Sequence, residues 1–241
     1  VATSGLIYKL NEDKKSYYVS EYIGIDIDII IPAKYDGLYV TSIGDSAFSN
    51  FIGLTSIEIP NSVTSIKYGA FSGCIGLTSI EIPDSVTTIE SFAFSGCIGL
   101  TRVEIPDSVT IIGAFAFSGC TGLTSIEIPN SVISIRYFAF SGCTGLTSLE
   151  IPASVINIED SAFSGCQNLT SIIVDKKNQK YDSRNDCNAI IDTQTNALIM
   201  GCKNTIIPED IKSIGVDAFY KCTGLTSIKI PDSVKTIGTR A

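Results

Sequence analysis

The chain has 241 residues, of which 44% are hydrophobic, a content that indicates a folded protein with a core rather than a disordered one. It contains no histidine, which excludes catalysis by an imidazole and metal sites with histidine ligands. The formal net charge of −8 repels nucleic-acid phosphates and anionic lipid surfaces, so nucleic acid is not an expected partner. No run approaches the roughly 20 apolar residues that cross a bilayer, and we expect no membrane insertion of this segment.

The first predicted element is an N-terminal segment, residues 1–31, that lies outside the repeat described below. Residues 6–10 and 16–20 have the pattern of two strands around a polar turn, which predicts a β-hairpin cap over the exposed edge of a stack. Residues 27–32 then form the first strand of that stack. The start of the chain lacks the basic and apolar regions of an export signal, so we expect any such signal to have been removed.

Residues 32–174 are a regular repeat with a period of 23 residues. The pair Ala-Phe recurs at every step from Ala47-Phe48 to Ala162-Phe163, and apolar columns recur at the same spacing, so each column is expected to face inward. An alternating strand such as Ile80-Glu81-Ile82 is followed by proline, which ends the strand because it has no N–H to extend the ladder. Every proline follows an isoleucine, at Pro32, Pro60, Pro83, Pro106, Pro129, Pro152, Pro208 and Pro231.

One such unit cannot bury enough apolar surface to fold alone, so neighbouring copies must stack and share a core. The predicted fold is therefore a mainly β solenoid. It is a right-handed stack of 23-residue coils with a parallel sheet, joined by short turns or 3-10 segments and closed by the N-terminal β-hairpin cap.

Six of the cysteines keep the repeat position, namely Cys74, Cys97, Cys120, Cys143, Cys166 and Cys222. A straight file does not supply the clustered ligands of a metal site. We therefore expect buried thiols that act as small hydrophobic side chains, and neither a metal nor another cofactor.

An insertion at residues 175–207 interrupts the repeat. Two apolar segments flank the polar residues 192–196, which predicts a β-hairpin. Pairing Asp192 with Ala197 places Cys187 opposite Cys202, where a disulfide would suit an exported protein. Residues 208–241 resume the repeat, and Ala241 falls one period after Ala218, so we expect phenylalanine to follow in a longer array that is cut here.

The repeat resembles the BspA-type leucine-rich repeats of surface proteins from gut and oral bacteria. The motif Ala-Phe-x-x-Cys-x-x-Leu-x-x-Ile-x-Ile-Pro at a fixed 23 residues carries this resemblance, with Cys-Asn-Ala-Ile-Ile in the insertion. The resemblance implies a leucine-rich-repeat solenoid on a secreted or cell-surface protein, often associated with adhesion to host proteins or other cells. It implies no catalytic residue.

Two files of residues are candidates for ligand binding. The first is acidic and has one arginine beside it, with Glu58, Glu81, Glu104, Glu127, Glu150 and Arg102. It predicts a groove for a cation or basic partner, or alternatively a charged face that keeps a sheet soluble. The second is aromatic, with Phe92, Phe115, Phe138, Tyr68 and Tyr137. These rings would stack on sugars or anchor a protein if exposed, or would cover gaps between coils.

These features predict a non-catalytic recognition module, a monomer that binds a host protein or glycan through the sheet face and the aromatic file. The alternative is a structural spacer that projects another domain of a longer surface protein. An enzymatic reading would need two neighbouring glutamates with different roles, and five equivalent copies argue against it. The neighbouring serines have no base to activate them.

Overall fold

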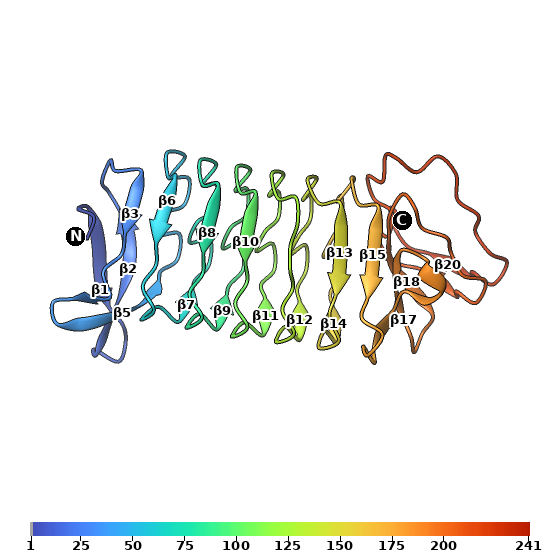
Figure 1. Ribbon diagram of the computed structural model, residues 1–241, viewed down its shortest axis with the longest axis horizontal. Helices are drawn as coiled ribbons and strands as arrows, with labels where there is room; N and C mark the ends of the chain where they lie inside the picture. Colours follow the sequence, from blue (N-terminus) through green and yellow to red (C-terminus); the bar gives the residue numbers. More distant parts are fainter. Residues whose placement is uncertain (1) are drawn as a thin grey trace.

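The computed structural model describes residues 2–241 as an elongated row of stacked coils, with the N-terminal hairpin at one end (Figure 1). The predicted solenoid of 23-residue coils is confirmed. Among these residues the only helix is one 3-10 turn, Arg184–Asp186, and the connections are otherwise turns and bends. None of the described residues lies in a helix long and apolar enough to cross a bilayer.

The N-terminal cap is a hairpin joined to the stack. Strands β1 (Leu6–Leu10) and β2 (Ser16–Tyr22) pair antiparallel, and β2 pairs in parallel with β5 (Leu38–Ile43). The short β4 (Lys34–Tyr35) folds back on β5 as an antiparallel pair. The cap therefore covers the apolar edge of the first coil, as the sequence predicted.

The segments before Pro32, Pro60, Pro83, Pro106 and Pro152, and the matching residues 171–174, form one row of parallel strands along the solenoid (Figure 1). These strands are β3 (Asp28–Ile30), β6 (Ser56–Glu58), β8 (Ser79–Glu81), β10 (Arg102–Glu104), β13 (Ser148–Ile151) and β15 (Ser171–Val174). They pair as β3–β6, β8–β10 and β13–β15, with an isolated bridge between Glu104 and Glu127. Buried residues alternate with exposed or half-exposed ones along each strand, so one face packs on the core.

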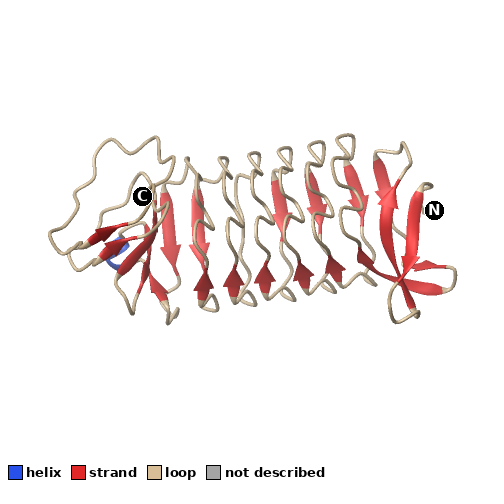
Figure 2. Cartoon of the chain, turned by 180° about the vertical axis from the view of Figure 1, so that it is seen from behind, coloured by secondary structure: helices blue, strands red, loops and turns tan. Residues whose placement is uncertain are grey.

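A second row of strands, which the sequence did not predict, makes the longer sheet (Figure 2). Its members are two-residue strands, β7 (Ser65–Ile66), β9 (Thr88–Ile89), β11 (Ile111–Ile112), β12 (Ser134–Ile135) and β14 (Asn157–Ile158). They pair in parallel from coil to coil and continue into β5 and the cap, giving nine strands in one sheet. The second row therefore joins consecutive coils without a break, whereas the first row pairs only within separate groups of strands.

A column of phenylalanines runs through the core. The rings of Phe48, Phe71, Phe94, Phe117, Phe140 and Phe163 are buried, and successive ring centroids lie 5.3 Å apart with nearly parallel planes. The backbone holds this spacing, since Phe71 N–H donates to the Ala93 carbonyl at 2.8 Å and the bond recurs in the following coils. Identical side chains therefore lie in rows along the molecule.

Beside this column runs a ladder of five buried cysteines. Each Sγ lies 3.1 or 3.2 Å from a phenylalanine carbonyl oxygen of the preceding coil, as Cys120 does to Phe94, which satisfies both groups inside the core. Burial disfavours the charged thiolate and raises the pKa of Cys74 and Cys166 to about 12, and raises that of the three thiols between them as well.

The insertion and the last coils share a five-stranded sheet. Its strands are β16 (Tyr181–Asp182), β17 (Ala189–Asp192), β18 (Ala197–Gly201), β19 (Ser213–Ile214) and β20 (Thr236–Ile237). The hairpin β17–β18 is antiparallel, whereas β18, β19 and β20 run in parallel as the repeat resumes. The insertion therefore contributes its own strand to the stack and does not interrupt it.

Cys187 and Cys202 are both free thiols in the structure. Asp192 pairs with Ala197 as predicted, but a register shift between Ile190 and Ile191 changes the pairing to Ala189 with Gly201. This bulge moves Cys187 one residue away from the position opposite Cys202. The two thiols also bond to different backbone carbonyls, Cys187 to Ala189 and Cys202 to Asn188. The sequence-based prediction assumed a hairpin without a bulge, and in such a hairpin the two cysteines would lie opposite each other.

A buried carboxylate ties the last two coils to the regular array. The side chain of Asp217 is 1% exposed and accepts hydrogen bonds from Arg240 Nε at 2.8 Å and Nη2 at 2.9 Å. It also accepts one from Ser161 Oγ at 2.6 Å, across the insertion. The carboxylate thus has partners on both sides, which offsets the cost of burying its charge.

Arg240→Gln should lower the free energy of unfolding, because the buried carboxyl of Asp217 would lose its ion pair and keep the hydrogen bond from Ser161. We expect the loss to be modest, since water screens the exposed guanidinium. Urea unfolding of this variant, of Asp217→Asn and of the double variant measures the coupling. If the loss of unfolding free energy in the double variant equals the sum of the two single losses, Arg240 and Asp217 are not energetically coupled.

Candidate ligand-recognition surfaces

The glutamate file lies on the outer face of the first row of strands. Its five members are exposed, while the residue before each one, such as Ile80 or Val103, points into the core. Glu104 pairs with Glu81 on one side and with Glu127 on the other, so the carboxylates stand on adjacent coils. Strand spacing of about 4.8 Å concentrates negative charge along the face.

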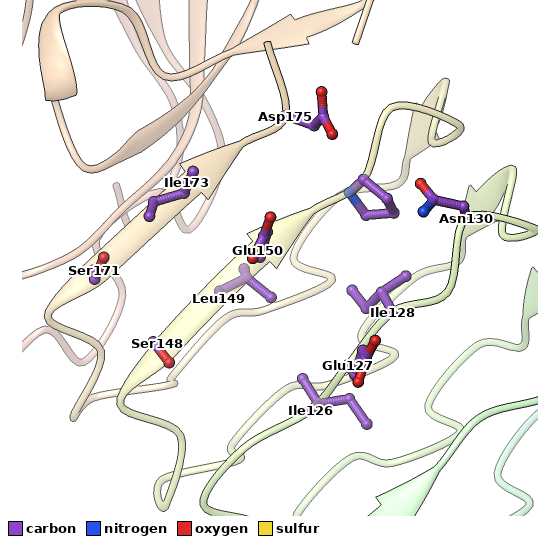
Figure 3. Close-up of a pocket in the computed structure, with 11 residues that line it drawn as sticks. Ile126, Glu127, Ile128, Asn130, Ser148, Leu149, Glu150, Ser171, Ile173 and Asp175 are labelled. Carbon is purple, nitrogen blue, oxygen red and sulfur yellow. The ribbon is translucent and has the colours of Figure 1, made fainter. Parts of the chain in front are cut away.

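A shallow hollow runs along the glutamate file. A second file of polar side chains, which was not predicted from the sequence, borders this hollow. Three adjoining hollows of about 450, 600 and 570 Å³ line up along the strands. The second file consists of the residue that follows the proline in four successive coils, with Asn61, Asp84, Asp107 and Asn130. In Figure 3, Asn130 and Asp175 lie beside Glu127 and Glu150 at one end of the hollow. The common place of Asn61, Asp84, Asp107 and Asn130 after Ile-Pro is the sequence signal that could have identified the second file.

Neutral and basic side chains interrupt the acidic file at its centre and replace it at its C-terminal end. Arg102 contacts Glu104 on the same strand, and both side chains are largely exposed. Beyond Glu150 the file continues with Ile173, which is 53% exposed, and Lys229, whose Nζ lies 2.6 Å from Glu209 Oε1. At the other end Asp28 accepts hydrogen bonds from Thr55 and Ser56, which lower the pKa of its carboxyl. Negative charge therefore extends over the five coils from Glu58 to Glu150, with one arginine at the centre and further negative charge at Asp28.

The three phenylalanines of the aromatic file have an unusual backbone. Phe92, Phe115 and Phe138 have φ of 62°, 58° and 54°, in the left-handed region that bulky residues rarely adopt. Their half-buried rings are stacked, with centroids 4.6 and 4.9 Å apart, and Tyr68 leans on Phe92 at 5.3 Å. The same position in other coils is Gly69 or Ser161, so phenylalanine is not required by the fold there.

Tyr68 and Tyr137 belong to the neighbouring column, and only Tyr68 also contacts this stack among the aromatic pairs of residues 2–241. Their side chains are 49% and 50% exposed, at the two ends of a separate hollow of about 430 Å³ beside the second row of strands. The structure therefore places the aromatic residues on a surface next to β9, β11 and β12, not within the glutamate hollow.

Among residues 2–241, no group of three or more cysteine or acidic side chains is placed to hold a metal ion. The two surfaces present groups that can bind a ligand through non-covalent contacts. The sheet hollow presents carboxylate acceptors and small polar side chains, and the second hollow presents aromatic ring faces.

A solenoid of 23-residue coils with a polar hollow along one row of strands defines a leucine-rich-repeat protein. The BspA type leucine rich repeat region matches residues 88–186 and 197–241, in six copies, and the chain belongs to this family. Regions of this type are repeat modules. A search of curated protein sequences finds no relative of the chain.

Several solved structures share the fold. A leucine rich cell surface protein from Faecalibacterium prausnitzii is 30% identical, with a TM-score of 0.73, and the match covers 99% of this chain and 72% of that one. A leucine rich repeat protein of T. pallidum is 25% identical, with a TM-score of 0.56, over 99% of this chain and 85% of its own. The pneumococcal vaccine antigen PcpA, at 21% identity and a TM-score of 0.76 over 99% and 66%, is similar in fold alone.

Proposed function

We propose that this chain is the non-catalytic recognition module of a secreted or cell-surface protein, and that its sheet hollow binds a protein partner with a basic surface. The observation that carries the proposal is the continuous hollow with exposed glutamates on adjacent coils. A cell-surface relative at 30% identity supports the location.

Electrostatics supports a basic partner on this face. The glutamates contribute like charges on neighbouring strands, and the second file adds Asp84 and Asp107 along the same hollow. A charged face keeps a sheet soluble, but solubility alone does not require that the carboxylates border a hollow. Lysines or arginines of a partner would relieve the repulsion between the files and would be steered toward them.

The test is binding to a panel of extracellular-matrix proteins, namely collagen, fibronectin and laminin, measured by surface plasmon resonance at several salt concentrations. We expect at least one to bind and the binding to weaken with salt. Replacing Glu81, Glu104 and Glu127 by glutamine should lower the affinity by about tenfold or more, equivalent to about 1.4 kcal/mol.

A matched control changes the net charge equally at exposed acidic positions outside the hollow, with Glu12→Gln, Asp36→Asn and Asp160→Asn. These should leave the affinity within twofold. Equal losses in both triple variants would point to net charge rather than to the sheet hollow. If no matrix protein binds and the glycan experiment below is also negative, the chain acts as a spacer, which its elongated shape also suits (Figure 1).

A further inference from the structure

The hollow between Tyr68 and Tyr137 spans four consecutive coils. Both tyrosines and the two residues between them, Ser91 and Ala114, occupy the same position of the repeat. Backbone hydrogen bonds at 2.9 to 3.0 Å join these coils, as from Phe92 N–H to the Ala114 carbonyl. Three strand steps of about 4.8 Å separate the tyrosines by about 14 Å. The two rings therefore stand at the ends of a trough whose middle has small side chains.

The floor of the trough is open for a specific reason. Gly113 lies where other coils carry Lys67, Glu90, Arg136 and Glu159. A Cβ on Gly113 would lie only 2.5 Å from the carbonyl carbon of Glu90, so the approach of the two coils excludes any side chain there. Gly113 therefore lines the trough with backbone alone, together with Ile111, which is 40% exposed.

Two polar side chains of opposite hydrogen-bonding character flank this floor. Glu90 is half-buried, and no hydrogen bond or ion pair engages its side chain among residues 2–241, so its carboxylate is free to accept hydrogen bonds. Arg136 is held by Glu159 through Nη1 at 2.7 Å, and its Nε and Nη2 remain available to donate. Glu159 also accepts from the Tyr137 N–H at 3.0 Å, which fixes the arginine beside that tyrosine.

We infer that this trough binds a short, uncharged oligosaccharide. The assignment rests on the proposed function as a recognition module and names the ligand of the second surface, the hollow between Tyr68 and Tyr137. The exposed tyrosine faces suit the C–H faces of pyranose rings. Sugar hydroxyls both donate and accept, so adjacent hydroxyls can donate to Glu90 and accept from Arg136. The volume of about 430 Å³ is in the usual range for small-ligand sites.

Other ligand classes fit less well. A proline-rich peptide also packs on aromatic grooves, but its proline nitrogens carry no N–H, and its carbonyls would face the acceptor-only Glu90. An anionic glycan would be repelled by Glu90 and by the net charge of −8. A neutral ligand with many hydroxyl groups satisfies both polar side chains without a charge penalty.

The experiment uses the whole chain on an array of neutral oligosaccharides that contain glucose, galactose, mannose and N-acetylglucosamine units. Calorimetry then measures the affinity of each bound, soluble oligosaccharide. Tyr68→Ala and Tyr137→Ala should each lower the affinity by about tenfold, and the phenylalanine variants should retain most of it because they keep the ring. Glu90→Gln should also weaken binding.

Ala114→Tyr is the decisive variant, since it fills the trough with the residue that this column already carries in two coils, and it should abolish binding while the chain still folds. Tyr39→Ala removes an equally exposed tyrosine elsewhere and should have no effect. The assignment is overturned if no neutral oligosaccharide binds, if Ala114→Tyr leaves binding unchanged, or if a proline-rich peptide binds the trough instead. A matrix protein that still binds the sheet hollow in any of these cases would leave the proposed function standing.

Discussion

Phe117→Ala should lower the free energy of unfolding by about 3–5 kcal/mol, the usual cost of removing a buried phenylalanine. The ring is fully buried and lies 5.3 Å from both Phe94 and Phe140, so its loss leaves a cavity and removes two stacked contacts. In a solenoid each coil is stabilised by its neighbours, and a defect in this middle coil weakens two interfaces at once. Urea unfolding followed by circular dichroism measures the change.

The matched control is Phe115→Gly, two residues away on the same coil. Removing this half-buried ring costs burial, but glycine relieves the left-handed backbone at φ 58°, as Gly69 does in another coil. We expect the two effects to offset, leaving the stability within about 1 kcal/mol of the original. A loss as large as that of Phe117→Ala would mean that the aromatic file is a core element and would favour its role in covering gaps between coils.

The regular part of this fold is predictable because a 23-residue period leaves each column with a single type of environment. Because the coils are equivalent, an Ala-Phe pair that faces inward in one coil is expected to face inward in the others. The phenylalanines from Phe48 to Phe163 are buried, as this argument predicts. The second row of strands could not be predicted in the same way. Two-residue strands such as Ser65–Ile66 are too short to carry an alternating pattern, and they form because the neighbouring coils present them in register.

The candidate surfaces were predictable in part. The exposed position of the glutamates follows from alternation with buried neighbours, whereas the hollow beside them depends on how the chain turns after each proline. The left-handed Phe115 gives no sequence signal, because phenylalanine is disfavoured in that conformation. The trough between Tyr68 and Tyr137 depends on the close approach of two coils at Gly113, which only coordinates reveal.

Alkaline pH should destabilise this protein more than its charge alone suggests, because of the cysteine ladder. Burial raises the pKa of Cys74 and Cys166 to about 12, from an ordinary value of 9.0, and the pKa of Cys97, Cys120 and Cys143 is raised too. Above pH 9 the unfolded chain loses these protons while the folded chain keeps them. The stabilisation is therefore complete below pH 9 and is lost as pH rises toward 12.

The expected size of this effect is large. At one pH unit above 9, each thiol favours the unfolded state by about 1.4 kcal/mol, so five thiols contribute about 7 kcal/mol at pH 10. That amount is comparable to the whole stability of a typical domain, about 5–15 kcal/mol. Chemical unfolding under reducing conditions, repeated from pH 7 to pH 11, should show a stability that falls ever more steeply above pH 9.

The triple variant Cys97→Ala, Cys120→Ala and Cys143→Ala isolates the contribution of the ladder. The slope of the unfolding free energy with pH counts the protons released on unfolding, so the variant should release about three fewer than the original chain at pH 10 to 11. Tyrosines ionise in both proteins and cancel in this difference, and any loss of stability from the substitutions shifts the curve without changing its slope. Identical slopes in the two proteins would mean that the thiols ionise as readily in the folded chain as in the unfolded one, and that the ladder is open to water.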